Sequence, residues 1–345
     1  MTQIELTTPG DLLDSQGNLC RPGYSRRELQ RYDRRAIHAS PLRIKEWDYY
    51  LISNGRFALA LTVADNGYMG LDSVSFLALE EGWEITKSKM QVMPLGRKAL
   101  PADSRAGDVH STGRSHSLHF LRRLGARELI AQMADFGPEG PLYARVTLTH
   151  EPEESILIAT PFAKPGHFYY NQKINCLRAR GYVTYGSRTW EFDPADSFAV
   201  LDWGRGVWTY ENTWYWSSVS APAPDGVPFG WNLGYGFGDT SAATENMLFY
   251  GGRGHKLDQV RFEIPGEGAG TPRFMDPWHI SSPDGRLEAE FRPVMDRAAD
   301  MNFQLLRSDQ HQVFGRFTGR AVLDDGQEIH FRDLPGFAEK VYNKW

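Results

Sequence analysis

Acidic residues set among aromatic ones are the groups in this sequence best suited to perform chemistry. Asp202, Glu211, Asp239 and Glu245 lie in or just after a stretch rich in tryptophan and tyrosine. A carboxyl group surrounded by aromatic rings has a raised pKa, because burial disfavours its charged form. In its protonated form it can donate a proton to an alkene, an alcohol or an epoxide. We therefore predict Asp202 and Glu245 as proton donor and base, with His255 and His311 as alternates.

The aromatic residues around these acids could form the wall of a binding pocket. If residues 207–217 form a strand, Trp208, Trp214 and Trp216 share one face. Such rings could stabilise positive charge that develops on an isoprenoid-like substrate. The predicted substrate-binding residues are Trp203, Arg205, Trp208, Tyr210, Glu211, Trp214, Trp216, Trp231, Asn232, Tyr235, Phe237, Asp239 and Asn246.

The same residues also have a purely structural interpretation. The rings could fill an ordinary sheet core in which their polar tips are satisfied internally. Asp202 could pair with Arg205 in a turn, Asp239 could cap a segment that begins at Thr240, and Glu245 could close the following loop. Both interpretations stay open from the sequence.

Three alternating glycines resemble a phosphate-binding loop only superficially. Gly234, Gly236 and Gly238 are followed by no Lys-Ser or Lys-Thr, and no long helix is expected after them. They alternate with Tyr235 and Phe237, so one face of the strand would be smooth and the other aromatic. We expect these glycines to make room for a ring, a backbone or a ligand.

Metal and thiol chemistry have little basis in the sequence. His116 and His119 share a face only on a helix, so we do not predict that they form a metal site with His110. Cys20 and Cys176 are far apart and indicate neither a disulfide framework nor a zinc ribbon. We expect neither a metal nor a cofactor.

Composition describes an ordinary globular chain. The 345 residues are 41% hydrophobic, enough to bury a large core in one or two domains. The net charge of −5 gives no general attraction to nucleic acid. We find no signal peptide and no apolar run near the roughly 20 residues that span a membrane, so we expect a cytoplasmic protein. Peripheral membrane contact and a homodimer are both compatible with the sequence.

Alternation of apolar and polar residues predicts antiparallel strands along most of the chain. Residues 51–63 read as two strands joined at Asn54 and Gly55, and the segments 260–264, 287–292 and 328–331 alternate in the same way. Helix signals are limited to residues 25–37, 118–133, where long strands are the alternative, and 240–247. This pattern predicts an all-β barrel or sandwich with few short helices.

A seam rich in proline and glycine, at residues 161–166, is where strands would break. We place a domain boundary there. It divides the chain into an N-terminal β domain, residues 1–165, and a C-terminal β domain, residues 166–345, which carries the aromatic residues.

Several segments resemble an uncharacterised bacterial family catalogued as a domain of unknown function. They are DWGRGVWTY at 202–210, WNLGYGFGDTSAATEN at 231–246, HKL at 255–257 and HQVFGRF at 311–317. That family is distantly similar to the lipocalin-like double-barrel superfamily of carotenoid hydratases, tocopherol cyclases and Diels–Alder cyclases. The resemblance implies two lipocalin-like antiparallel β-barrels packed side by side, with an apolar ligand in or between them. The His-x-Trp and Tyr-x-Asp pairs of the carotenoid hydratases are absent, so carotenoid hydration itself is not implied.

These observations lead to three hypotheses for function. The first is a cofactor-independent enzyme that acts on a hydrophobic, lipid- or isoprenoid-like molecule by general acid–base chemistry, as a cyclase, isomerase or hydro-lyase. The second is a non-catalytic carrier of a hydrophobic ligand. The third is a structural or partner-binding protein, which predicts an exposed apolar patch and no enclosed cavity.

Overall fold

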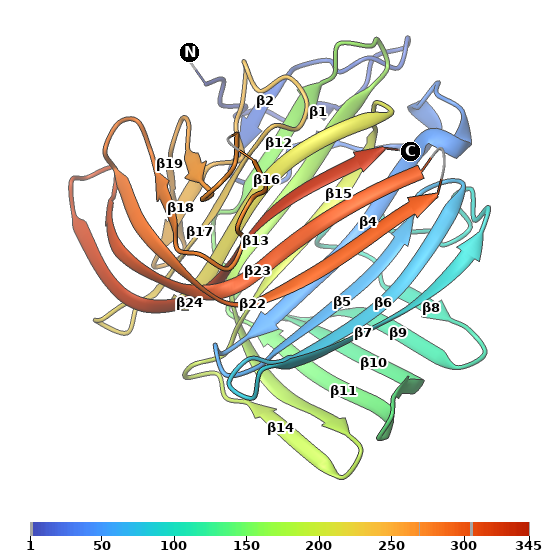
Figure 1. Cartoon of the computed structure of the whole chain (residues 1–345). Helices are drawn as coiled ribbons and strands as arrows, with labels where there is room; N and C mark the ends of the chain where they lie inside the picture. The colour runs from blue at the N-terminus through green and yellow to red at the C-terminus, as the bar shows by residue number, and fades with distance from the viewer. Residues whose placement is uncertain (1–2, 269, 304–305, 345) are drawn as a thin grey trace.

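Antiparallel strands make up almost the whole molecule (Figure 1). The computed structural model describes residues 3–268, 270–303 and 306–344. Within them, the only helices are two short 3-10 turns, η1 (Arg34–Ala36) and η2 (Pro41–Arg43). The strands form a 13-stranded sheet, a 9-stranded sheet and a small parallel pair of β1 (Gly10–Asp11) with β3 (Gln30–Arg31). The predicted all-β fold with few short helices is confirmed.

The first sheet has the strand order β7-β6-β5-β4-β15-β13-β11-β10-β9-β8, with β2, β12 and β14 attached beside this path. Its members are β2 (Gly23–Ser25), β4 (Ile44–Ser53), β5 (Ala58–Asp65), β6 (Met69–Ala78), β7 (Trp83–Val92), β8 (Val109–Thr112), β9 (His116–Arg123), β10 (Ala126–Gly137), β11 (Gly140–Thr149), β12 (Ile156–Pro161), β13 (Phe168–Tyr185), β14 (Arg188–Phe192) and β15 (Phe198–Val207). The sheet curls around a large hydrophobic core of its own.

The second sheet has the order β19-β18-β17-β16-β24-β23-β22-β21-β20. Its members are β16 (Glu211–Pro222), β17 (Pro228–Tyr235), β18 (Met247–Tyr250), β19 (Arg253–Lys256), β20 (Arg261–Glu263), β21 (Trp278–Ser281), β22 (Leu287–Phe303), β23 (Leu306–Val322) and β24 (Glu328–Lys344). It also curls around its own core. In neither sheet do the end strands of this order pair with each other within the described residues, so both are curved half-barrels.

The strand β15 belongs to the first sheet and lies between the core of that sheet and the second sheet. Both of its faces are therefore buried. Its ten residues are all buried. Because side chains alternate along a strand, Leu201 and Trp203 point into the first core, while Val200 and Asp202 face the second sheet. A strand covered on both sides is expected to read as a nearly continuous apolar run.

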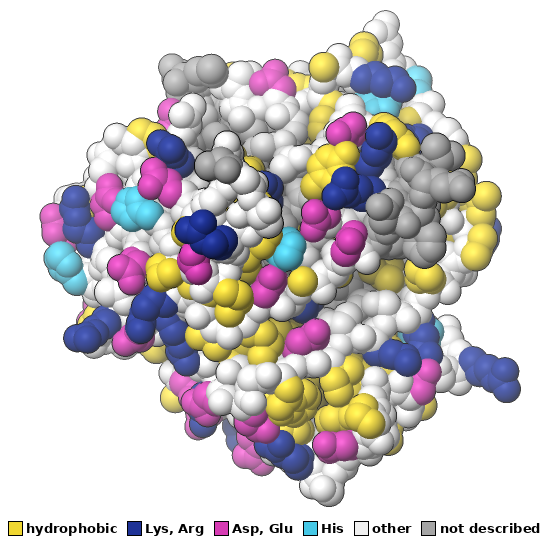
Figure 2. Space-filling model, in the orientation of Figure 1, with side chains coloured by type: hydrophobic (Ala, Val, Ile, Leu, Met, Phe, Trp, Pro, Cys, Tyr) yellow, Lys and Arg dark blue, Asp and Glu magenta, His cyan; other side chains and the backbone are white. Residues whose placement is uncertain are grey.

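Two features join the sheets. A shared hydrophobic cluster contains Leu51 and Val200 of the first sheet with Phe314 and Phe337 of the second. In addition, the pairing of β13 is irregular near Asn175, whose amide donates hydrogen bonds to side-chain and backbone oxygens of β16 and β17. Figure 1 shows β22–β24 running beside β4–β7, and Figure 2 shows charged side chains spread over this face, with hydrophobic ones gathered below its centre.

Of the two alternatives for residues 118–133, the strands are confirmed and the helix is wrong. These residues form the hairpin of β9 and β10, because Gly125 adopts a positive φ and reverses the chain. Three other local predictions are wrong. Residues 25–37 contain β3 and η1, and 240–247 contain no helix. The predicted strand at 207–217 is interrupted, since β15 ends at Val207 and β16 begins at Glu211.

The change from one sheet to the other falls at residues 208–210. The strands β13, β14 and β15 therefore belong to the first sheet, although they follow the predicted boundary at residue 165. The division into domains 1–165 and 166–345 stays a proposal. No helix in the described part of the chain is long and apolar enough to cross a membrane.

Candidate functional site

A cavity of about 490 Å³ lies between the two sheets. The first sheet contributes side chains from β4–β7, β13 and β15, and the second contributes side chains from β16 and β22–β24. Its lining changes in character along its walls, from tryptophan and tyrosine rings, through buried ionisable groups, to serine and threonine hydroxyls. A pocket with many apolar groups and few, well-placed polar ones is typical of a site for a small molecule.

The aromatic part of the cavity is formed by Trp47, Tyr169, Trp208, Trp214 and Phe237. The rings of Trp47 and Tyr169 are stacked with centroids 6.1 Å apart, and Phe237 meets Trp208 edge-on at 4.8 Å. These contacts hold the rings in fixed positions along the cavity wall.

Gly204 on β15 makes room for one of these rings. A Cβ at this position would lie 1.9 Å from the Trp47 indole. The small residue within the DWGRGVW motif therefore fixes where Trp47 packs, and through it the shape of the aromatic wall.

Glu339 is the most unusual group in the cavity wall. It lies on β24 between Phe337 and Val341 of the same face, and only 3% of the residue is exposed. One carboxylate oxygen accepts a hydrogen bond from Trp214 Nε1 at 3.0 Å, and the other accepts one from Gln312 Nε2 at 2.9 Å. Burial nevertheless dominates and raises the pKa of Glu339 to about 7. This carboxyl can therefore both donate and accept a proton near neutral pH.

Asp202 and Lys173 form a buried ion pair beside Glu339. Lys173 Nζ lies 2.8 Å from Asp202 Oδ1 and 4.0 Å above the Trp216 ring. Asn171 donates a second hydrogen bond to the same carboxylate oxygen at 2.7 Å. Asp202 thus pairs with Lys173 across two strands, and not with Arg205 in a turn.

Glu245 is the third buried carboxyl of the cavity. Its Oε2 accepts a hydrogen bond from Asn232 Nδ2 at 3.0 Å and lies 3.9 Å from Lys173 Nζ. Burial raises the pKa of Glu245 above its ordinary value and outweighs the opposite effect of Lys173. Gly234 makes room for this carboxyl, because a Cβ there would lie 2.3 Å from Glu245 Oε1.

Polar atoms with unused hydrogen-bonding capacity also line the cavity. The buried hydroxyl of Tyr49 lies near the Gln312 amide but forms no hydrogen bond of ordinary geometry. Burial raises the pKa of Tyr49 to about 12, so its hydroxyl remains a donor at neutral pH. Gln312 Oε1 and Asn343 Oδ1 are likewise buried and have no partner among the described residues. Buried polar atoms usually find partners, so these three are suited to contact a ligand or water.

Six of the predicted site residues line this cavity: Asp202, Glu245, Trp208, Trp214, Trp216 and Phe237. A seventh, Asn232, lies directly behind the wall. Its Oδ1 accepts a hydrogen bond from Trp216 Nε1 at 2.6 Å, while its amide group donates to Glu245. Asn232 therefore positions one ring and one acid of the site.

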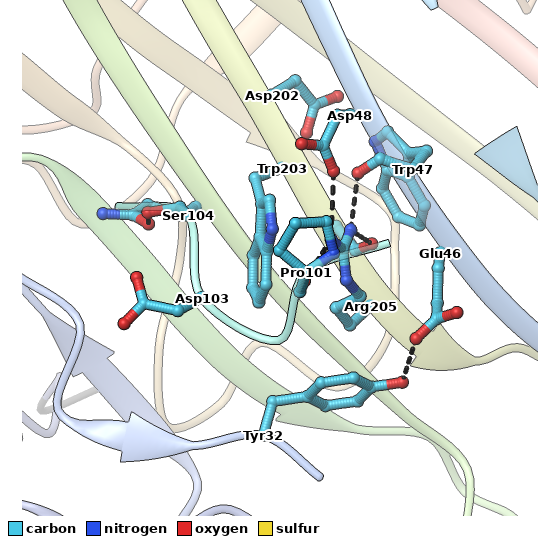
Figure 3. A network of polar contacts seen from close by, with 12 residues as sticks. Tyr32, Glu46, Trp47, Asp48, Pro101, Asp103, Ser104, Asp202, Trp203 and Arg205 are labelled. Atoms are coloured by element: carbon cyan, nitrogen blue, oxygen red, sulfur yellow. Dashed lines mark hydrogen bonds and ion pairs between the residues drawn. The ribbon is translucent and has the colours of Figure 1, made fainter. Parts of the chain in front are cut away.

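Trp203 and Arg205 face away from the cavity, into the first half-barrel (Figure 3). The fully buried Arg205 donates to the Trp47 carbonyl at 2.8 Å, the Pro101 carbonyl at 2.7 Å and Asp48 Oδ1 at 3.0 Å. Its guanidinium lies 4.2 Å above the Trp203 ring. Arg205 thus fastens the long loop at 93–108 to β4 and β15, and its role is structural.

Trp231 and Asn246 are integrated into the second half-barrel. Trp231 is fully buried in its core and donates to Ser217 Oγ at 3.1 Å. Asn246 accepts from the Gly234 amide at 2.7 Å and donates to the Asp258 carbonyl at 3.0 Å. Both stabilise the sheet that presents Glu245.

Three further predicted residues, Glu211, Tyr235 and Asp239, line a separate surface depression. The Glu211 carboxylate accepts a hydrogen bond from the Tyr342 hydroxyl at 2.8 Å. The Tyr210 ring is 41% exposed and lies 5.6 Å from Lys344 Nζ. None of these four residues belongs to the lining of the inter-sheet cavity.

The two predicted histidines lie elsewhere on the second sheet. His311 on β23 contacts Asp296 at 2.6 Å and stacks on Phe274 at 3.8 Å. His255 on β19 accepts a hydrogen bond from the Asp324 amide at 3.2 Å, and burial lowers its pKa. Neither lines the cavity. Across the described residues, no three His, Cys, Asp or Glu side chains are grouped in a way that could hold a metal.

Five residues of the cavity wall were not predicted from the sequence: Tyr49, Lys173, Arg297, Gln312 and Glu339. A signal for two of them was present. Lys173 is the one charged residue among ten consecutive buried positions at the start of β13, and Glu339 occupies an inward position between two apolar residues. A charged group at a core position is rarely tolerated without a partner or a function.

The fold and the site together define a protein of two curved antiparallel β-sheets with an aromatic and acidic cavity between them. The chain belongs to the family described as Domain of unknown function (DUF2804), whose model matches residues 3–345. This confirms the predicted membership of a family of unknown function. No curated protein is significantly similar in sequence.

Two solved structures resemble the chain in shape. One is a protein of Nitrosomonas europaea assigned as AttH, which is 13% identical, with a TM-score of 0.49 and coverage of 88% of this chain and 92% of that one. The other is kievitone hydratase from Nectria haematococca, which is 12% identical, with a TM-score of 0.46 and coverage of 87% of this chain and 88% of that one. Similarity at this level does not bear on function, for which the site itself is the basis.

Proposed function

We propose that this protein is a cofactor-independent enzyme that acts on a hydrophobic, lipid- or isoprenoid-like small molecule by general acid–base chemistry in the inter-sheet cavity. The observation that supports this most is the position of Glu339. A fully buried carboxyl, held through both oxygens, faces a cavity walled by aromatic rings. Such a combination has a clear chemical use and a high cost for a purely structural role.

In the proposed reaction, protonated Glu339 donates its proton to an alkene carbon or to a hydroxyl oxygen of the substrate. Protonation of an alkene leaves a carbocation, and protonation of a hydroxyl allows water to depart with the same result. The ring of Trp214 stabilises this positive charge. The Tyr49 hydroxyl is placed to donate a hydrogen bond to a substrate oxygen.

Removal of a proton from a neighbouring carbon completes the reaction. Asp202, held as a carboxylate by Lys173, and Glu245 are the candidates for this base. After protonation of an alkene, loss of a proton from another carbon gives an isomerase, and attack by an internal alkene before that loss gives a cyclase. After departure of water from a protonated hydroxyl, loss of the carbon proton leaves an alkene, which is the reaction of a hydro-lyase. In each case the base returns the proton to Glu339 through solvent, so the enzyme is regenerated.

A non-catalytic carrier is the alternative function, and the ion pair of Lys173 with Asp202 favours it. A carboxylate already neutralised by a cation is less basic than a free one. A carrier needs the aromatic wall, whereas it does not need Glu339.

The test starts with ligands that copurify with the protein, identified by mass analysis of an organic extract and by native mass spectrometry. Turnover of the identified compound is then compared in wild type, Glu339→Gln, Asp202→Asn and Glu245→Gln. Loss of general acid catalysis should reduce turnover by about 10²–10⁴-fold in Glu339→Gln, with binding retained. Glu290→Gln, an exposed site on β22, is the matched control.

Either of two results would overturn the proposed enzymatic function. The extracted compound could remain chemically unchanged after incubation with wild type, or all three acid variants could keep full turnover. If Trp216→Ala then abolished binding, the carrier function would be established instead.

A further inference from the structure

Arg297 is a cation at the cavity whose hydrogen-bonding capacity is largely unused. It lies on β22, and Nη1 donates to Ser75 Oγ on β6 of the opposite sheet at 2.9 Å. A guanidinium has five N–H groups. Across the described residues Arg297 has no ion-pair partner, although most arginines here have one. Glu84 and Asp300 also line the cavity, but neither pairs with it.

Part of the cavity wall near Arg297 is a strip of uncharged hydroxyl side chains, called here the hydroxyl strip. Five hydroxyl side chains on β5–β7 line the cavity here: Thr62, Ser73, Ser75, Thr86 and Ser88. They are linked to one another, since Thr86 donates to Ser75 at 2.8 Å and Ser73 shares a hydrogen bond with Ser88 at 2.9 Å. The strip therefore holds Arg297 in place without neutralising it.

The positive charge of Arg297 acts electrostatically on Glu339, the candidate acid. The guanidinium lowers the pKa of Glu339, and thereby partly offsets the effect of burial. An anion bound to Arg297 would cancel this influence and favour the protonated form of Glu339. Binding of an acidic substrate would thus prepare the proton donor.

We infer that the cavity takes an amphipathic carboxylic acid, whose apolar body lies against the aromatic wall and whose carboxylate pairs with Arg297 beside the hydroxyl strip. This inference rests on the proposed function only in using the same cavity. A planar carboxylate matches the fork of a guanidinium and can accept two parallel hydrogen bonds from it.

The test measures quenching of tryptophan fluorescence by all-trans-retinoic acid and by its uncharged methyl ester. We expect wild type to bind the acid about tenfold more tightly than the ester, as a charge-assisted hydrogen-bonded pair would provide. Arg297→Met should bind both compounds with the affinity of wild type for the ester. Ser75→Ala tests the support of Arg297, and Arg292→Met, on the same strand but paired with Asp333 outside the cavity, is the matched control.

A second measurement tests whether Glu339 takes up a proton when the acid binds. Calorimetry near pH 7 in buffers of different ionisation enthalpy should show proton uptake when wild type binds retinoic acid, and none with Glu339→Gln. Equal affinity of wild type for acid and ester, or a preference for the acid that persists in Arg297→Met, would overturn the inference and leave the proposed function intact. Failure of wild type to bind either compound would likewise overturn the inference, whereas the proposed function is decided by turnover of the copurifying compound.

Discussion

The titration of Glu339 gives a direct measure of the proposed acid. Its pKa is raised from an ordinary 4.5 to about 7 in the folded protein. Between these values the folded state retains a proton that the unfolded state has lost, so stability falls as the pH rises through this window. Each unit of difference between the pKa values of the folded and unfolded states corresponds to roughly 1.4 kcal/mol, so the full loss of stability across the window is about 3 kcal/mol. Below the window both states are protonated, and above it both are ionised.

Replacement of Glu339 by glutamine should remove this slope. Urea unfolding followed by tryptophan fluorescence, from about pH 5 to about pH 8, gives the free energy of unfolding of wild type and Glu339→Gln. The difference, wild type minus variant, should decrease by about 2 to 3 kcal/mol over this range. Glutamine offers one acceptor oxygen instead of two to Trp214 and Gln312, but that loss is the same at every pH and leaves the slope unaffected.

The exposed Glu328→Gln on the same strand serves as the control and should parallel wild type. Subtraction also cancels other groups that titrate in this range, such as Lys256, whose pKa burial lowers to about 7. A difference that stays constant across the range would show that Glu339 is ionised throughout, and the assignment of a proton donor at this position would then be refuted.

Three further substitutions distinguish residues that stabilise the fold from residues that act in the cavity. Lys173→Met should lower the free energy of unfolding at neutral pH by about 3–5 kcal/mol, because Asp202 and Glu245 lose their buried cation; a smaller effect than 1 kcal/mol in urea unfolding would contradict the ion pair. Arg205→Met should cost a similar amount, about 3–5 kcal/mol, yet leave the affinity for methyl retinoate unchanged in fluorescence titration, because the residue faces away from the cavity. His311→Gln should change neither binding nor turnover, and a large loss in either assay would place the chemistry outside the inter-sheet cavity.

Local signals were sufficient to predict the fold class, because strand alternation and turn residues act over a few positions. The hairpin predicted at Asn54 and Gly55 joins β4 to β5, as expected, with a loop that closes at the pair Ser53 and Ala58. At 118–133 the strand alternative was correct and the helix was wrong, because one glycine reverses the chain in the middle of an otherwise periodic segment. The chain passes from the first sheet to the second at residues 208–210, which include neither proline nor glycine. No local sequence signal therefore predicts this transition.

The site could be predicted only in part, because its walls come from strands far apart in the chain. Asp202 and Glu245 were found since they lie near the aromatic residues in sequence as well as in space. Lys173 and Glu339 lie on β13 and β24, and their relation to the rings depends on how the sheets pack. The alternation rule that places Trp214 and Trp216 on one face also places Asp202 and Arg205 on opposite faces of β15, but it could not indicate which of those faces borders the cavity.

The position of β24 has a consequence for how a nascent chain acquires this cavity. The strand follows β16 and β23 in sequence but lies between them in the sheet. Until β24 leaves the ribosome, both neighbours therefore have an unpaired edge available to other chains. Because Glu339 belongs to this same strand, a newly made molecule pairs both open edges and gains its proposed proton donor in a single event.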